Sequence, residues 1–113
     1  MNIQIFGTKK SFDTKKAQRY FKERRIKFQF IDLKEKEMSK GELQSVMRAV
    51  GGLDAVIDES AKDQDTVALI KYLAESQKFD KLLEIQQVLR GPIVRNGKQA
   101  TVGYQPDVWG SWE

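Results

Sequence analysis

GPIVRNGKQATVGY, residues 91–104, is the stretch that most clearly indicates the fold of this 113-residue chain. Two β-rich runs at 93–95 and 98–102 flank Asn96-Gly97. Asn-Gly between such runs is the strongest short-range hairpin signal, because both turn residues must accept a positive φ. The stretch therefore predicts a β-hairpin, with Pro92 at the first strand position, where proline is tolerated.

The first 32 residues predict a strand, a helix and a second strand. Apolar residues at 3–6 are ended by Gly7, and a polar turn follows at 8–12. Helical spacing then predicts a helix to about residue 25, capped at its start by Ser11 or Asp13. A second strand at 28–32 completes a β-α-β unit, which favours two parallel strands with a right-handed crossover.

The middle of the chain is predicted to be helical. Ser39 and Glu42 have the spacing of a capping box, and Gly51-Gly52 ends the helix that they begin. Two further helices are expected at 66–74 and 79–88, with Leu69, Ile70, Leu73, Leu82, Leu83 and Ile85 facing inward. A short helix opens at 106–109, and Trp109 and Trp112 favour core packing over an exposed partner site. One domain, residues 1–113, accounts for all of these elements.

Composition excludes several classes of function. Cysteine and histidine are absent, which removes disulfides, thiolate nucleophiles, histidine bases and structural zinc. No apolar run approaches the roughly 18 residues of a membrane span, and no signal peptide precedes the first strand, so a cytoplasmic location without membrane contact is expected. Residues 1–40 carry a net charge of +7 and residues 41–113 carry −3. The basic residues are interpreted mainly as a solvated helix face, with an anionic ligand or partner as the alternative: Lys15, Lys16, Arg19, Lys22 and Lys27.

Three segments together resemble the arsenate reductase (ArsC) family, which includes the Spx and YffB proteins. They are GTKKSFDTKKA at 7–17, GLDAVI at 52–57 and the hairpin stretch at 91–104. The resemblance implies an α/β, thioredoxin-like fold with a mixed four-stranded sheet and a helical insertion. It also implies a cis Pro92 facing the turn before the first helix, where the family places a nucleophilic cysteine. Unpaired amides at a helix start stabilise a thiolate or a bound oxyanion.

Ser11 stands where this resemblance places the cysteine, and Thr14 where Spx-type members have a second one. A serine hydroxyl needs a neighbouring base, so a capping role is favoured for Ser11. The serine is either natural or a deliberate replacement of cysteine. The residues expected to bind an anion or a thiol are Lys10, Thr14, Lys15, Arg90, Gly91 and Pro92.

Other positions depart from the family pattern in ways that disfavour arsenate. Glu59 and Tyr104 stand where related chains carry arginines, and Arg90 is separated from Pro92 by Gly91. An acidic group near an oxyanion opposes binding.

The resemblance therefore indicates a relative of the glutathione- or glutaredoxin-linked arsenate reductases that is thiol-inactive. It has no bound cofactor, and a small oxyanion, glutathione as co-substrate or glutaredoxin is its expected partner. The alternative is an Spx-like regulator that binds RNA polymerase. Direct nucleic-acid binding is disfavoured, because helical spacing assigns Tyr20 and Phe21 to the core.

Overall fold

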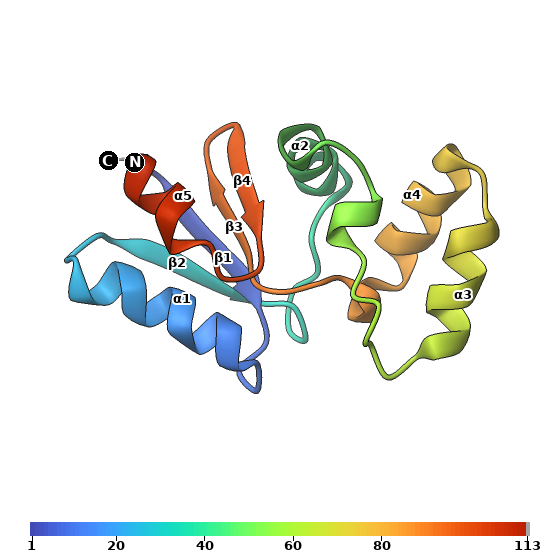
Figure 1. Ribbon diagram of the computed structural model, residues 1–113, viewed down its shortest axis with the longest axis horizontal. Coiled ribbons are helices and arrows are strands. Elements are labelled where there is room, and N and C mark those ends of the chain that lie inside the picture. The colour runs from blue at the N-terminus through green and yellow to red at the C-terminus, as the bar shows by residue number, and fades with distance from the viewer. Residues whose placement is uncertain (113) are drawn as a thin grey trace.

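A computed structural model describes residues 1–112. A four-stranded sheet lies toward one end of the molecule (Figure 1). The strands are β1 (Ile3–Gly7), β2 (Phe28–Asp32), β3 (Ile93–Asn96) and β4 (Gln99–Val102). Their order across the sheet is β2-β1-β3-β4. β1 and β2 are parallel, whereas β1–β3 and β3–β4 are antiparallel, which confirms the predicted mixed sheet.

The hairpin forms where the sequence predicts it, but its turn lies one residue later. Asn96 pairs with Gln99, so the two-residue loop is Gly97-Lys98 rather than Asn96-Gly97. Gly97 has φ of 62°, and Asn96 stays in the strand. Only one residue of the loop needs a positive φ, and glycine provides it at no steric cost. The Gly91-Pro92 peptide bond that precedes β3 is cis, as the family resemblance implies.

Alternating side chains of the sheet bury against different helices. Ile3 and Ile5 pack with one cluster that includes Tyr20 and Phe21 of α1 (Phe12–Glu23) and Trp109 of α5 (Pro106–Ser111). Tyr20 and Phe21 are therefore core residues as predicted, and Trp109, which is 1% exposed, belongs to the core as well. Phe6, between Ile5 and the strand end, faces the second cluster on the other side.

α1 ends two residues before the predicted boundary. Arg24 is its C-cap and Arg25 has φ of 57°, a left-handed conformation that cannot continue a helix. The solvated face predicted for this helix is confirmed, since the side chains at positions 15, 16, 19 and 22 are exposed.

The helical insertion carries the second cluster away from the sheet, so that α3 and α4 lie at the opposite end of the molecule from α1 (Figure 1). It comprises α2 (Lys40–Val50), the 3-10 turn η1 (Asp54–Val56), α3 (Gln64–Tyr72), α4 (Glu75–Glu84) and the 3-10 turn η2 (Gln86–Val88). The capping box of Ser39 and Glu42 is present at the start of α2. None of the helices within residues 1–112 combines the length and the apolar content needed to cross a membrane.

Two predicted helices in this insertion have different boundaries. The helix expected at 66–74 runs from Gln64 to Tyr72, because the side chain of Asp63 accepts a hydrogen bond from the Thr66 amide and caps it. The helix expected at 79–88 begins earlier and ends at Glu84, since Ile85 leaves helical geometry with φ of −121°. Leu69 was predicted to face inward and is instead 46% exposed, while Ile70 and Leu82 are fully buried.

Candidate functional site

The site predicted from the sequence begins at the turn between β1 and α1. The Ser11 amide donates to the Thr8 carbonyl at 3.2 Å, which closes the turn. Ser11 Oγ accepts from the Thr14 amide at 3.2 Å, so Ser11 rather than Asp13 is the N-cap of α1. The Phe12 and Asp13 amides, at the first two helical positions, have no carbonyl one turn back to bond. A helix start of this kind offers N–H donors and partial positive charge to an anion.

Three chain segments meet beside this helix start, at Gly7 and Gly91. A Cβ on Gly7, at the end of β1, would lie 2.8 Å from Thr14 Cγ2 and closer still to Thr14 Oγ1. A Cβ on Gly91 would lie 3.8 Å from Gly7 Cα and 3.9 Å from Thr14 Oγ1. The end of β1, the first turn of α1 and the segment before β3 are therefore in close contact, and Gly7 is required for that contact.

Thr14 holds an unpartnered polar atom at this junction. The residue is 1% exposed, and its Oγ1 has no hydrogen-bond partner among the described residues. A buried hydroxyl that lacks a partner costs about 1–3 kcal/mol, and most buried polar groups in proteins are paired. Thr14 lines a cleft, but its Oγ1 is covered by the Gly7 and Gly91 backbone, so a ligand or water reaches it only if these segments shift.

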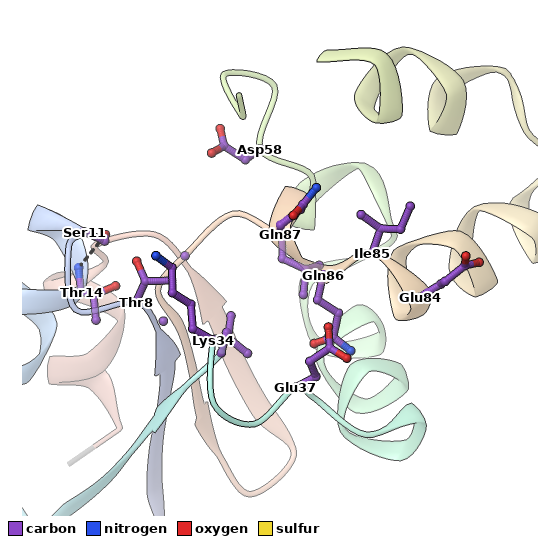
Figure 2. A pocket seen from close by; sticks show the side chains of 14 residues that line it. Thr8, Ser11, Thr14, Lys34, Glu37, Asp58, Glu84, Ile85, Gln86 and Gln87 are labelled. Carbon is purple, nitrogen blue, oxygen red and sulfur yellow. Dashed lines mark hydrogen bonds between the residues drawn. The ribbon is translucent and has the colours of Figure 1, made fainter. Parts of the chain in front are cut away.

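The cleft has a volume of about 800 Å³ and extends from the α1 N-terminus to the helical insertion. In Figure 2, Thr8, Ser11 and Thr14 lie at one end of the cleft, and Glu84, Ile85 and Gln87 line it farther along. The turn after β2 contributes Leu33, Lys34 and Glu37 to the lining, and the segment after η1 contributes Asp58. The rest of the lining consists of Gly7, Gln86, Leu89 and Gly91. Its size is that of a small-molecule site.

The charged groups of the cleft lining are mostly acidic. Among the described residues, Lys34 is the one lysine that lines it, against the carboxylates of Glu37, Asp58 and Glu84. The acidic groups lie beyond the α1 N-terminus, on the linker after β2 and on the insertion. Within residues 1–112 no three carboxylates gather closely enough to hold a metal ion. The cleft therefore has the partial positive charge of the helix start at one end and carboxylates at the other.

A buried glutamine fixes the wall that carries two of these carboxylates. Gln86, only 4% exposed, accepts from the Met38 amide at 2.7 Å and donates to the Met38 carbonyl at 2.8 Å. The same Nε2 donates to the Leu83 carbonyl at 3.2 Å. These bonds join the linker that bears Glu37 to the end of α4 that bears Glu84.

The structure brings together some of the sequence-predicted site residues and separates others. Ser11, Thr14 and Gly91 line the cleft. Pro92 is buried next to them, without lining it. The three predicted basic residues are exposed and do not line the cleft: Lys10, Lys15 and Arg90.

Two of these basic side chains, Lys15 and Arg90, contact residues outside the cleft. Lys15 Nζ lies 5.8 Å from the centre of the Phe12 ring. The Arg90 guanidinium lies against Gly103, with one nitrogen 3.3 Å from where a Cβ would be. Glu59, at a position where the resemblance expects an arginine, forms a surface ion pair with Lys71 at 2.9 Å.

The sequence reasoning missed the acidic part of the cleft. One signal was available for Lys34 and Glu37, because the residues after two neighbouring parallel strands meet at the same sheet edge. Indeed the Leu33 amide donates to the Gly7 carbonyl at 2.9 Å. No local signal identifies Asp58, Glu84 or Gln87, since their placement depends on how the insertion packs.

Comparisons with known proteins show similarity in structure rather than in sequence. No protein-family model matches the chain, and no curated protein matches it. An ArsC family related protein from Bacteroides fragilis superposes with a TM-score of 0.87 at 15% identity, covering 100% of this chain and 98% of that one. Arsenate reductase from Vibrio cholerae gives 0.82 at 21% identity, covering 96% and 94%. A YffB protein gives 0.77 at 20% identity, covering 97% of each chain.

The mixed sheet, the helix after the first strand and the cis-proline hairpin define a thioredoxin-like α/β fold. The structural neighbours match nearly the full length of the chain, insertion included. The fold is therefore that of the ArsC-type proteins, and the resemblance inferred from the three sequence segments is confirmed at the level of the fold.

Proposed function

We propose that this chain is a thiol-inactive, ArsC-type binding protein that holds a small ligand in the cleft at the α1 N-terminus. The cleft beside the α1 N-terminus carries the proposal, because Thr8, Ser11 and Thr14 line it at the helix end that carries a partial positive charge. An anionic group of a ligand placed there would be stabilised by that partial charge, and a small shift of the Gly7 and Gly91 backbone would open the buried Thr14 hydroxyl to it as a further donor.

Ser11 supports the thiol-inactive part of the proposal. Its Oγ already serves the Thr14 amide, and the chain contains neither cysteine nor histidine. A serine that lacks a partner base stays protonated and is a poor nucleophile. The side chain therefore acts as a helix cap, and turnover by a thiolate mechanism is not expected.

The charges of the cleft support a ligand that carries both signs. A multiply charged oxyanion such as arsenate would meet the Glu37 and Asp58 carboxylates, which oppose it, and that of Glu84, which an ion pair with Lys81 at 3.6 Å partly offsets. A compound with a carboxylate for the α1 end and an ammonium group for the acidic end would satisfy both. Glutathione has these groups, and its thiol is not needed for either contact.

Titration calorimetry with reduced glutathione, S-methylglutathione, arsenate and phosphate tests the proposal. The two glutathione forms should bind equally well, and Thr14→Val should weaken both at least fivefold, while the two oxyanions bind weakly or not at all. Ser45→Ala, which removes a half-buried hydroxyl on α2 outside the cleft, is the matched control and should leave binding unchanged. Arsenate binding tighter than glutathione binding, or equal losses in both variants, would contradict the proposal.

The regulator interpretation stays a separate prediction. Pull-down of RNA polymerase subunits with the intact chain tests it directly, and no retained subunit would dismiss it.

A further inference from the structure

A second groove lies on the other side of α1, away from the cleft. It has a volume of about 410 Å³ and runs between α1 and the segment that enters α5. Lys16, Arg19 and Arg24 line it, and Glu23 supplies the one carboxylate that the described residues contribute to its lining. The described residues provide no ion-pair partner for any of the three cations. The groove therefore presents three positive groups that are free to bind an anion.

Aromatic rings hold two of these cations in place. The Arg24 guanidinium lies 3.7 Å from the centre of the Tyr20 ring, and its Nη1 donates to the Tyr20 carbonyl at 3.2 Å. Lys16 Nζ lies 5.5 Å from the centre of the Tyr104 ring. Cation–π contacts restrict a long side chain without neutralising its charge, so less side-chain entropy is lost when an anion binds.

The same contacts argue against a stacked nucleic-acid base. Tyr20 is 7% exposed and packs edge-on against Phe21 and Trp109, while Arg24 covers its remaining face. Tyr104 packs edge-on against Trp109 and has Lys16 over its ring. Single-stranded nucleic acids use several open aromatic faces as stacking platforms, whereas Tyr20 is closed off here and Tyr104, which is 40% exposed, is partly covered by Lys16.

We propose that this groove, formed by α1 and the β4–α5 segment, docks an acidic segment of a partner protein. Lys16 and Arg19 lie one turn apart on α1 and Arg24 is its C-cap, so the three cations are spread along the groove and reach successive carboxylates of an extended chain rather than one compact ion. The arginine guanidinium groups suit carboxylates because both groups are planar and pair through two parallel hydrogen bonds. The surrounding basic face of α1 steers such a segment toward the groove.

Fluorescence anisotropy with a labelled octaglutamate peptide and a labelled single-stranded oligomer of eight deoxythymidines tests the proposal. The double variant Lys16→Gln/Arg19→Gln should weaken peptide binding about tenfold, which corresponds to about 1.4 kcal/mol for two exposed ion pairs. The double variant Lys22→Gln/Lys27→Gln removes the same charge from exposed positions outside the groove and should weaken binding less than twofold.

A further variant separates geometry from charge. Arg24→Lys keeps the charge but loses the planar group, and should weaken peptide binding about threefold. All these positions are exposed, and thermal unfolding confirms that each variant folds before binding is compared. Equal losses in the groove and control variants, absence of peptide binding, or tighter groove-dependent binding of the oligonucleotide would each overturn the proposal.

Discussion

Substitution of Gly7 by alanine should destabilise the protein through Thr14, and removal of the Thr14 side chain should rescue much of the loss. The Cβ added to Gly7 would lie 2.8 Å from Thr14 Cγ2 and 3.2 Å from Thr14 Cβ, and closer still to Oγ1. Thr14 is 1% exposed and lies in the first turn of α1, so it cannot swing into solvent. Either Thr14 changes rotamer against its neighbours, or β1 and α1 move apart.

The magnitude follows from two opposing effects. Overpacking of a tightly packed site costs about 1–3 kcal/mol. Gly7 has no positive φ, so alanine fits its backbone and recovers about 0.4–1 kcal/mol by restricting the unfolded chain. The net loss should be about 1–2 kcal/mol, which lowers the Tm by about 5–15 °C for a domain of this size. With Thr14→Ala only the Cβ at 3.2 Å remains, and a shift of tenths of an ångström accommodates it.

A double-mutant cycle measures this coupling. Urea unfolding of the parent chain, Gly7→Ala, Thr14→Ala and the double variant should give an interaction of about 1 kcal/mol in favour of the double variant. Gly41→Ala is the matched control, because no atom lies within 4 Å of its added Cβ and the position is helical. It should stabilise the protein by about 0.5–1 kcal/mol. A Gly7→Ala loss of equal size with and without the Thr14 side chain would refute the steric argument.

Three further predictions concern single residues. Gln86→Leu should destabilise the protein by about 2–4 kcal/mol in urea unfolding, because the buried amide and carbonyl of Met38 lose their partners; a loss below about 1 kcal/mol would contradict this role. Hydrogen bonds from the Thr66 side chain and backbone lower the pKa of Asp63 below its ordinary value of 3.8. The ionised carboxylate therefore stabilises the fold above that value, and the contribution is lost as the pH falls through the lower folded pKa. Urea midpoints measured from pH 5 to pH 2 should fall more steeply for the parent chain than for Asp63→Asn, and parallel curves would exclude the effect. Ser11→Cys should give a thiol whose pKa lies below the usual value of about 8.5, since the helix amides favour the thiolate; thiol titration with no depression would show that the helix start does not stabilise anions.

Local signals in the sequence account for most of the elements of the fold. The hairpin, the capping box of α2 and the cap of α1 each depend on residues a few positions apart, and each forms as predicted apart from the one-residue shift at Gly97-Lys98. The misplaced boundaries lie at the end of α1 and in α3 and α4, and the early start of α3 follows from the local cap of Asp63 on Thr66. The cap is a local contact, whereas the bond that Asp63 also accepts from Gln87 comes from a distant part of the chain. A single sequence does not reveal such a long-range contact.

The residues of the candidate site likewise fall into those that local sequence patterns indicate and those that depend on long-range packing. Ser11, Thr14 and Gly91 could be predicted because a turn, a helix start and a proline-led strand have recognisable patterns. The predicted roles of Lys10 and Lys15 rested on their closeness to Ser11 in sequence, and side chains next to a helix cap need not point toward the same space. Lys15, for example, extends over the Phe12 ring.

Different segments of the chain supply the hydrogen-bonding groups of the cleft and its negative charge. The β1–α1 turn supplies amides and hydroxyls whose geometry is fixed by backbone hydrogen bonds over a few residues. The insertion supplies the carboxylates, and Gln86 is the contact that holds them in place. Loss of the Gln86 contacts should therefore alter which ligands bind before it alters the cap of α1, because no hydrogen bond of Gln86 among the described residues reaches that turn. The proposed anion binding at the helix start and the proposed discrimination by charge should therefore be separable, because the turn and the carboxylates belong to different segments of the chain.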